Sequence, residues 1–494
     1  MIITKTSLIA AATITKKVWA AIGNQKYLPT YRLGELDNRL MRYETIPPQL
    51  FIENRQRLAS LLPRNSLAVV NANDVCPTNA DGVQGTIVNS DLFYLTGIEQ
   101  EQSILLLYPD ADDGDHHEIL FLREPSAELQ LWEGHKLSKS EARQLTGVTN
   151  IRWLSEFPRL FHRLMCESEH AFFNSNEHKR AIIDVESRDA RLIADTKRKY
   201  PLHDHRRLAP LMHRLRAIKS ETEIKLIRNA CQLTNQGFRR VLRFVEPGVS
   251  EWEVEAEFGH EFTRRGGRFA YLPIIASGLN ACCLHYVSND HFCRAGDLLL
   301  LDVGASYANY NSDLTRTIPV SGRFKPRQKA VYNSVLRVLN QCIAGLVPGK
   351  KIKDWQIEAE QAIERELVDL KLVTTRDIKL QSPDSPAFKK YFMHGVGHPI
   401  GLDVHDVGLT VEPIQSGWVM TVEPGIYLPA EGFAVRLESD VLVTSAGPVN
   451  LMADIPVEAD EIEDLMGARI MLDGKRHGAN HRAGKIRLPI KTRR

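Results

Sequence analysis

The first half of the chain alternates short apolar runs with turn residues. Between residues 65 and 123, three such runs read as strands, namely "NSLAVVNAND", "DLFYLTGI" and "QSILLLYPDADDGDHHEILFL". The Asp- and Gly-rich stretch 110–115 inside the third run predicts a hairpin loop. Apolar residues at helical spacing follow at 138–146 and 185–199. This half of the chain therefore predicts an α/β domain.

The second half opens with two helix-start signals. Ser220 and Glu223 have the spacing of a capping box, and the apolar positions after them keep helical periodicity as far as the Pro-Gly pair at 247–248. Ser250 predicts the start of a second helix, which ends at the paired glycines 266–267. Strand-like runs follow, so the second half predicts helices packed over a sheet.

The length of the chain, 494 residues, predicts two or three domains rather than one. Between the two halves lies the segment "YPLHDHRRLAP" at 200–210, which is rich in proline and histidine. Such a composition predicts a linker, with His203 and His205 on its surface.

The formal charge of +2 hides an uneven distribution. Residues 1–34 hold five Lys and Arg without an acid, and residues 474–494 hold eight. The rest of the chain has 50 basic and 61 acidic residues, so its charge is near −11. This acidic body argues against a nucleic-acid partner. No apolar run approaches the roughly 18 residues that a membrane span needs.

Cysteine usage and the N-terminus bear on the compartment. The seven cysteines show no Cys-x-x-Cys spacing, so neither a disulfide framework nor a zinc ribbon is indicated, and a reducing compartment such as the cytoplasm is expected. Residues 1–40 lack the order of a secretory signal. They are basic and acid-free, which keeps organelle targeting open as the alternative.

Candidate chemistry begins with "MHGVGHPIGLDVHDVG" at 393–408, which contains His394, His398 and His405. The first two have the His-x-x-x-His spacing of helical zinc ligands. Two glycines lie between them, however, and each disfavours a helix by about 1 kcal/mol relative to alanine. A helical metal pair is therefore a poor interpretation of this stretch.

Two pairs of acids on apolar strands are a stronger signal. A turn between Tyr307 and Ala308 would place Asp302 directly opposite Asp313 on one face of a hairpin. Two carboxylates in that position repel each other unless a cation lies between them.

A second predicted hairpin repeats this arrangement. A turn between residues 430 and 431 would place Glu423 opposite Glu438. Buried carboxylates need protons or cations, and four of them beside a histidine cluster exceed what one divalent ion requires. We therefore expect two divalent ions, with Mn²⁺ as first choice and Co²⁺ or Zn²⁺ as substitutes, and hydrolytic chemistry.

Five motifs in order carry a family resemblance: "HY" at 285–286, "LLLLDVGASYANYNSDLTRT", "HGVGHPIGLDVHDVG", "TVEPGIY" and "VRLESD". They resemble the pita-bread metallopeptidases and, within them, the aminopeptidase P (Xaa-Pro aminopeptidase) group. The resemblance implies an α/β (α+β) fold in which a creatinase-like N-terminal α/β domain precedes a curved antiparallel sheet covered by helices. It also implies a homo-oligomer, either a dimer or a tetramer.

The same resemblance implies a role for each candidate residue. It implies five metal ligands: Asp302, Asp313, His398, Glu423 and Glu438. Glu423 would also be the general base toward a metal-bridging hydroxide. The resemblance further implies four residues on the substrate side or beside the metal carboxylates: His285, His394, His405 and Arg436.

Two departures from the family pattern stand out. The usual "RIED" is "RLES" here, so Ser439 replaces an acid that is not a ligand. The usual "FRQNSD" is "TIVNSD" at 86–91, which is expected to alter contacts of the N-terminal domain with substrate or with another subunit. The resemblance also divides the chain into four parts: 1–40, an extension; 41–205, the creatinase-like domain; 206–466, the catalytic domain; and 467–494, a basic tail.

The expected reaction is hydrolysis of the N-terminal Xaa-Pro bond of peptides. A prolidase, which cuts only Xaa-Pro dipeptides with the same metal centre, is the nearest alternative. Methionine aminopeptidase is disfavoured by the N-terminal domain, and the metal-free creatinase by the complete ligand set. A non-catalytic binding homologue of the fold is the alternative outside enzymes, and it too is disfavoured because such relatives lose ligands.

Overall fold

The computed structural model describes residues 42–467 except 86, 182–183 and 383. The predicted N-terminal extension and nearly all of the predicted basic tail lie outside the described residues. The described residues from Ile46 onward belong to one compact unit. None of the described helices is both long and apolar enough to cross a membrane.

A mixed sheet organises the N-terminal half. Its six strands follow the order β4-β3-β2-β1-β5-β6, in which β1, β2 and β3 pair antiparallel and the other neighbours pair parallel. The strands are β1 Ser66–Asn71, β2 Ile104–Leu107, β3 Glu118–Leu122, β4 Asn150–Trp153, β5 His170–Phe173 and β6 Asp204–Arg207. The helices of this half are α2 Pro48–Leu61, α3 Ser90–Thr96, α4 Ala127–Glu133, α5 Lys139–Thr146, α6 Phe157–Glu167 and α7 Arg188–Lys199.

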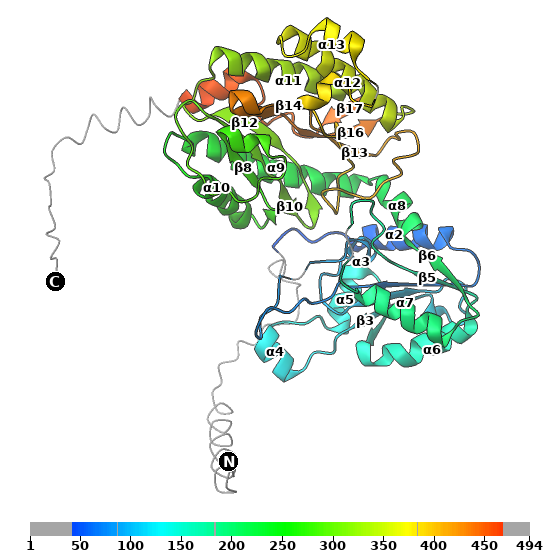
Figure 1. The fold of residues 1–494 in the computed structure, drawn as a ribbon. Helices are drawn as coiled ribbons and strands as arrows, with labels where there is room; N and C mark the ends of the chain where they lie inside the picture. Colours follow the sequence, from blue (N-terminus) through cyan, green and yellow to red (C-terminus); the bar gives the residue numbers. More distant parts are fainter. Residues whose placement is uncertain (1–41, 86, 182–183, 383, 468–494) are drawn as a thin grey trace, which may run out of the picture. The chain divides into compact units, whose positions relative to one another are not determined.

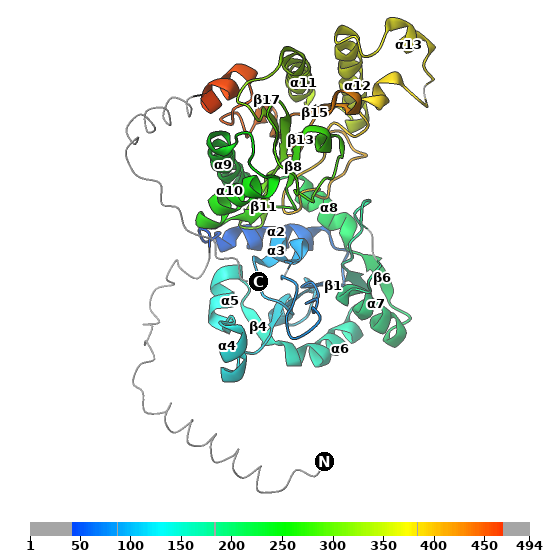
Figure 2. The ribbon, with the colours of Figure 1, turned by 60° about the vertical axis from the view of Figure 1, so that its left-hand side comes forward.

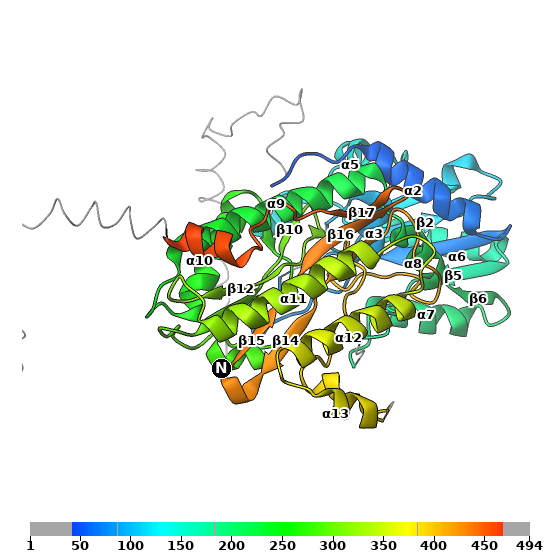
Figure 3. The same ribbon diagram turned by 90° about the horizontal axis from the view of Figure 1, so that it is seen from above.

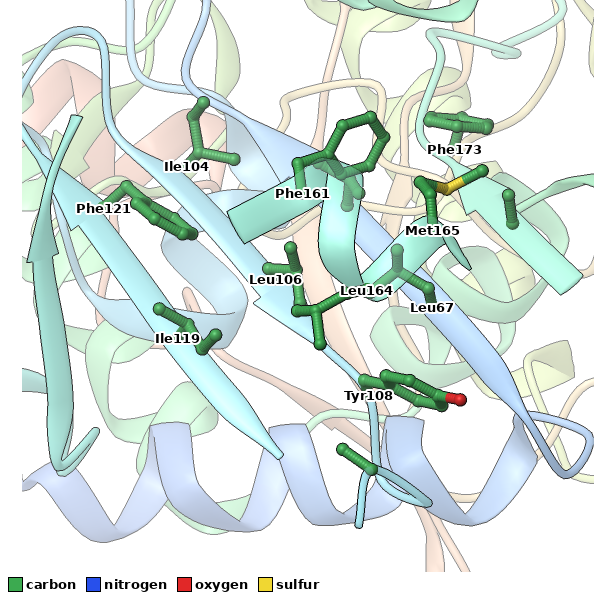
Figure 4. Packing of buried hydrophobic residues seen from close by; sticks show 13 residues of the cluster. Leu67, Ile104, Leu106, Tyr108, Ile119, Phe121, Phe161, Leu164, Met165 and Phe173 are labelled. Atoms are coloured by element: carbon green, nitrogen blue, oxygen red, sulfur yellow. The ribbon is translucent and has the colours of Figure 1, made fainter. Parts of the chain in front are cut away.

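Apolar side chains cover both faces of this sheet. On one face, Phe161, Leu164 and Met165 of α6 pack on residues from β1, β2, β3 and β5 (Figure 4), and α7 lies against the same cluster. On the other face, Ala142 of α5 packs against Leu120 and neighbouring residues of β3 and β4. The sheet therefore lies between two helical layers, as the α/β prediction requires (Figure 1).

Two predicted elements of this half are wrong. The run "DLFYLTGI" forms helix α3 rather than a strand, because the Asn89 side chain accepts the first free N–H groups and Gly97 ends the helix in the left-handed conformation. The segment 200–210 is not a linker, because β6 within it pairs parallel with β5. Accordingly, His205 is half-buried and stacks on Phe173. The predicted helices and the hairpin loop between β2 and β3 are confirmed.

Helices of the C-terminal half form two layers around short antiparallel sheets. They are α8 Ala209–Ala217, α9 Glu221–Phe244, α10 Glu251–Arg264, α11 Pro326–Gly345, α12 Ile352–Asp369 and α13 Thr375–Leu380. Both predicted caps are present, since the side chains of Ser220 and Ser250 accept backbone N–H groups in complete capping boxes. Helices α9 and α10 lie side by side (Figure 2). Helix α11 crosses the strands near the C-terminus (Figure 3).

The strands of this half pair antiparallel throughout the described residues. Their sheet orders are β11-β10-β7, β12-β9-β8, β13-β16-β17 and β14-β15. The strands are β7 Arg268–Phe269, β8 Ile274–Ser277, β9 Leu298–Asp302, β10 Ala305–Tyr307, β11 Tyr310–Asn311, β12 Thr315–Pro319, β13 Val419–Val422, β14 Gly425–Leu428, β15 Phe433–Arg436, β16 Ser439–Thr444 and β17 Gly447–Asn450. The predicted arrangement of helices over an antiparallel sheet is confirmed.

One of the two predicted hairpin registers is correct. Gly425 pairs with Arg436, and Val422 pairs with Ser439, which places Glu423 and Glu438 opposite each other between the two ladders. In the other hairpin the turn lies one residue later than predicted.

In that hairpin Ala308 and Asn309 both take positive φ values, 50° and 65°, as a tight two-residue turn requires. Asp302 therefore pairs with Thr315 rather than with Asp313. The two aspartates are diagonal neighbours on the same face instead of direct partners.

Candidate metal centre

The strands of the C-terminal half bring the predicted ligands together. Asp302 ends β9 and Asp313 precedes β12, whereas Glu423 follows β13 and Glu438 lies between β15 and β16. His398 reaches the same place from the loop before β13. Ligand atoms of three of them, Asp313, His398 and Glu438, lie within 4.8 Å of one another, the spacing of a metal site.

The remaining predicted ligands border this group. The Nε2 atom of His398 is 3.6 Å from Asp313 Oδ2 and 3.8 Å from Glu423 Oε1. The Nδ1 atom of His398 donates to the carbonyl of Pro399 at 2.9 Å, so Nε2 is the nitrogen that faces the carboxylates. This orientation points Nε2 at the position that a cation between the carboxylates would occupy, as in metal-binding histidines.

Tyr271, in the loop before β8, was not predicted. Its hydroxyl lies 2.6 Å from Asp302 Oδ1 and 2.5 Å from Asp313 Oδ1, so it donates to either of the two carboxylates. No charged group or motif marks it in the sequence, because its role depends on where the loop passes over the diagonal pair.

A hydrogen-bonded chain runs from Asp302 to His394. Arg436 donates to Asp302, and also to the Tyr427 hydroxyl at 2.9 Å. Tyr427 in turn donates to Nε2 of His394 at 2.9 Å, whose Nδ1 donates to the carbonyl of Gly395 at 2.8 Å. Both ring nitrogens of His394 are therefore engaged within the protein.

Burial and mutual repulsion raise the proton affinity of the acids. Burial raises the pKa of Glu423 to about 7, and burial with the charges of Asp313 and Glu423 raises the pKa of Glu438 well above its usual value. Burial likewise raises the pKa of Asp302. The raised pKa values show that these carboxylates lack enough positive charge around them, which a divalent cation would supply, so the donor set fits a metal.

The histidines differ in their surroundings. Burial lowers the pKa of His398, but Asp313 and Glu423 outweigh it and raise the pKa to about 9. Burial and the charge of Arg436 lower the pKa of His394 to about 4, so this ring is neutral at pH 7. The exposed His285 lies near enough to His394 to contribute to that lowering.

His405 contacts His398 directly through its ring. The two rings are stacked, with centroids 3.9 Å apart and planes 21° apart. Arg180, from the loop after β5, lies 2.6 Å from Nδ1 of His405, another contact that the sequence did not suggest. The same guanidinium nitrogen lies 3.3 Å from Nε2, so Arg180 approaches both ring nitrogens of His405.

Comparisons with known proteins agree with this geometry. Residues 225–445 match metallopeptidase family M24, and residues 51–173 match the aminopeptidase P N-terminal domain. The Xaa-Pro aminopeptidase of Escherichia coli K12 is 32% identical over 440 residues, which are 86% of this chain and 98% of that protein. The chain belongs to metallopeptidase family M24. As a member it is a hydrolase, a metallo-aminopeptidase of the aminopeptidase P type.

Two further likenesses are informative. A zinc-substituted E. coli aminopeptidase P in complex with product has a TM-score of 0.78 and 30% identity, and the match covers 86% of this chain and 99% of that one. A mitochondrial intermediate cleaving peptidase 55 of Arabidopsis thaliana is 29% identical, over 84% of this chain and 82% of that protein. The family uses divalent metal, and the zinc-substituted relative illustrates that more than one metal can occupy such a centre.

Proposed function

We propose that this M24 aminopeptidase removes the first residue from peptides whose second residue is proline, with two divalent ions and with Mn²⁺ as the first choice. The convergence of Asp313, Glu423 and Glu438 on His398, with Asp302 joined to Asp313 through the Tyr271 hydroxyl, carries this proposal. Asp302, Asp313, His398, Glu423 and Glu438 would hold the ions, which supply Lewis acidity toward water and toward the scissile carbonyl.

The chain's own groups would move the proton. Glu423 lies at the centre, 3.8 Å from Nε2 of His398, and is the carboxylate to which we assign the role of general base. In the proposed mechanism it takes a proton from the attacking water and gives it to the proline nitrogen, which leaves as a secondary amine. This transfer is needed because the proline nitrogen would otherwise leave as an amide anion, which is too basic to be expelled.

Of the histidines, His405 is best placed to stabilise the tetrahedral oxyanion. Its ring stacks on that of His398 with centroids 3.9 Å apart, which places it beside the metal ligands. His394, whose two nitrogens are both engaged, would orient the site through Tyr427 and Arg436. His285 is exposed and would contact the substrate.

The nearest alternative, a prolidase, is not favoured, because several relatives that match most of the chain are Xaa-Pro aminopeptidases. The test compares hydrolysis of Xaa-Pro-Yaa, Xaa-Pro and Xaa-Ala-Yaa peptides by the purified protein. We expect efficient cleavage of the first kind alone. Preference for the dipeptide would establish the prolidase instead, and cleavage of none would favour the binding homologue.

Metal content and Glu423 are tested together. We expect about two activating divalent ions per chain, Mn²⁺ giving the highest activity, and for Glu423→Gln a loss of turnover by at least about a hundredfold with the fold kept. Fewer than one ion per chain, or an active Glu423→Gln variant, would contradict the proposal.

Three further proposals concern the setting of the enzyme. We infer a homo-oligomer, to be measured by light scattering of the purified protein. We divide the chain into extension, N-terminal domain, catalytic domain and tail as predicted, with the boundary between the N-terminal and catalytic domains moved from residue 205 to beyond β6. We also propose the cytoplasm as its location, with an organelle as alternative in view of the plant mitochondrial relative; a fluorescent fusion to residues 1–40 distinguishes the two.

A further inference from the structure

The "NSD" segment at 89–91 contacts the loop that carries His405. It follows directly on "TIV", the three residues that depart from the family pattern. Asn89 caps helix α3, which fixes the two residues after it. The hydroxyl of Ser90 donates to Asp403 Oδ1 at 2.7 Å. Thus a residue of the N-terminal domain holds a residue two positions before His405.

Arg216, on α8, completes the connection. One of its terminal nitrogens donates to Asp91 Oδ1 at 2.8 Å, and the other donates to Asp403 Oδ2 at 2.6 Å and to Asp406 Oδ1 at 2.5 Å. Lys219 donates to the second oxygen of Asp406 at 3.0 Å. We call these residues, with Ser90, the Arg216 cluster.

The Arg216 cluster is rigid on electrostatic grounds. Arg216 and Asp406 are each 3% exposed, and Lys219 is 5% exposed. A buried charge that loses its partner is strongly destabilising, so the fit of these side chains admits little displacement. The loop is also held at its backbone, because the buried Asn311 side chain donates to the carbonyls of Gly401 and Leu402.

The Arg216 cluster fixes the position of His405. This residue lies between Asp403 and Asp406, both of which bond Arg216. Its ring is stacked at 3.9 Å on His398. A shift of the loop would therefore move the His405 ring relative to the centre, and displacements near 1 Å are costly in catalysis.

We propose that Ser90, Asp91 and Arg216 are positioning residues for His405, so that the N-terminal domain takes part in transition-state stabilisation through its "NSD" segment. This inference rests on the proposed function of His405. A purely structural role of the same contacts would lower stability without acting through His405, and the two roles make different predictions.

The test is a double-variant cycle on a Xaa-Pro-Yaa peptide. For Ser90→Ala, which removes one hydroxyl, we expect kcat to fall roughly tenfold and KM to change less than about twofold. In the His405→Ala background the same change should have almost no further effect on kcat, because the group through which it acts is gone. Losses that multiply in the double variant would overturn the proposal.

A second variant and a matched control separate an effect of the Arg216 cluster from a general effect of contacts between the two halves. Asp91→Asn removes the charge that faces Arg216 and should reproduce the kcat effect. Glu99→Gln changes another contact between the two halves, with Asn309, that does not involve the Arg216 cluster. It should leave kcat and KM unchanged. An equal loss of kcat in Glu99→Gln would show that any contact between the two halves affects turnover. That result would overturn the assignment of Ser90, Asp91 and Arg216 as positioning residues.

Hydrogen–deuterium exchange of the segment 399–408 tests the same contacts without activity. Exchange there should rise in Ser90→Ala and Asp91→Asn but not in Glu99→Gln. If the wild-type protein cleaves no Xaa-Pro peptide, the proposed function fails while this measurement still reports on the cluster. Unchanged exchange in both variants would overturn the inference even if the enzyme is active.

Discussion

At the scale of single residues, the two aspartates of the centre share one neutral donor. The half-buried Tyr271 points its hydroxyl at Asp302 and Asp313, and desolvation of that hydroxyl together with both carboxylates raises its pKa well above the usual value. The phenol therefore stays protonated and moderates the repulsion between the two acids. A bound cation would neutralise the same oxygens, so the contribution of Tyr271 depends on metal.

Tyr271→Phe is expected to lower the free energy of unfolding of the metal-free protein by about 1–3 kcal/mol. The loss should shrink when divalent metal is added, because the carboxylates then have another partner. Tyr332→Phe is the control, since its buried hydroxyl donates to the carbonyl of Val457 away from the centre. Its loss should be the same with and without metal. Thermal unfolding with chelator and with Mn²⁺ measures both, and a metal-independent loss for Tyr271→Phe would contradict this role.

The sequence was most informative where a charged residue stands next to an apolar strand that is expected to be buried. Four of the predicted ligands are acids at the ends of apolar strands, and such a position has few explanations apart from a cation. Tyr271 and Tyr427 could not be found in this way, because a buried tyrosine is ordinary. Their roles come from the tertiary positions of hydroxyl groups, which local patterns do not contain.

At the scale of elements, the loop 393–399 positions His394 and His398 by packing closely against neighbouring segments. A β-carbon on Gly397 would lie 2.0 Å from the carbonyl oxygen of Thr421 and 3.0 Å from the Trp355 ring. At Gly395 the nearest atom is 3.8 Å away. The two glycines therefore differ in function, although the sequence shows them only as helix-breaking residues.

Gly397→Ala is expected to displace His398, because backbone on one side cannot yield to the added methyl group. We expect a destabilisation of about 1–3 kcal/mol, as in other overpacked sites, together with weaker metal binding. Gly395→Ala is the matched control and should retain both stability and metal. Calorimetric titration with Mn²⁺ and thermal unfolding measure the pair; equal behaviour of the two variants would show that close packing at Gly397 is unimportant.

Elements were predictable where their ends carry local signals. The helices that begin at Ser220 and Ser250 have capping boxes in the sequence, and the structure contains both. Helix α3 looks like a strand in the sequence because its seven residues are too few to show helical periodicity, and a single Asn at the cap position is a weak start signal. The register of the Asp302 hairpin depends on left-handed Ala308, a conformation unusual for alanine, so no rule of turn composition places that turn.

At the scale of the whole molecule, the centre joins residues that are far apart in the chain, and the electrostatic cost of bringing the acids together acts on overall stability. For Glu423 the folded-state pKa of about 7 lies above the usual value, and those of Asp302 and Glu438 are also raised. The metal-free folded state therefore holds protons that the unfolded chain has already lost between about pH 4.5 and 7.

The sign of the pH dependence follows. Without metal, stability should fall as the pH rises from 5.5 to 8, because the folded state must either keep these protons or accept repulsion. His398 acts in the same direction, since its raised pKa of about 9 stabilises the folded state below pH 6.5 and loses that contribution as the pH rises toward 9. Glu423 alone would account for about 1–3 kcal/mol.

Divalent metal should therefore stabilise the protein more at pH 8 than at pH 5.5, since fewer protons compete for the ligands at the higher pH. At a hundredfold excess over Kd the gain is about 2.7 kcal/mol. The measurement is Tm at both pH values with chelator and with Mn²⁺. Glu423→Gln, which removes one titrating carboxyl, should flatten the pH dependence of the metal-free protein. A metal-free Tm that rises between pH 5.5 and 8, or a metal gain that is equal at both, would show that the buried carboxyls do not determine this stability.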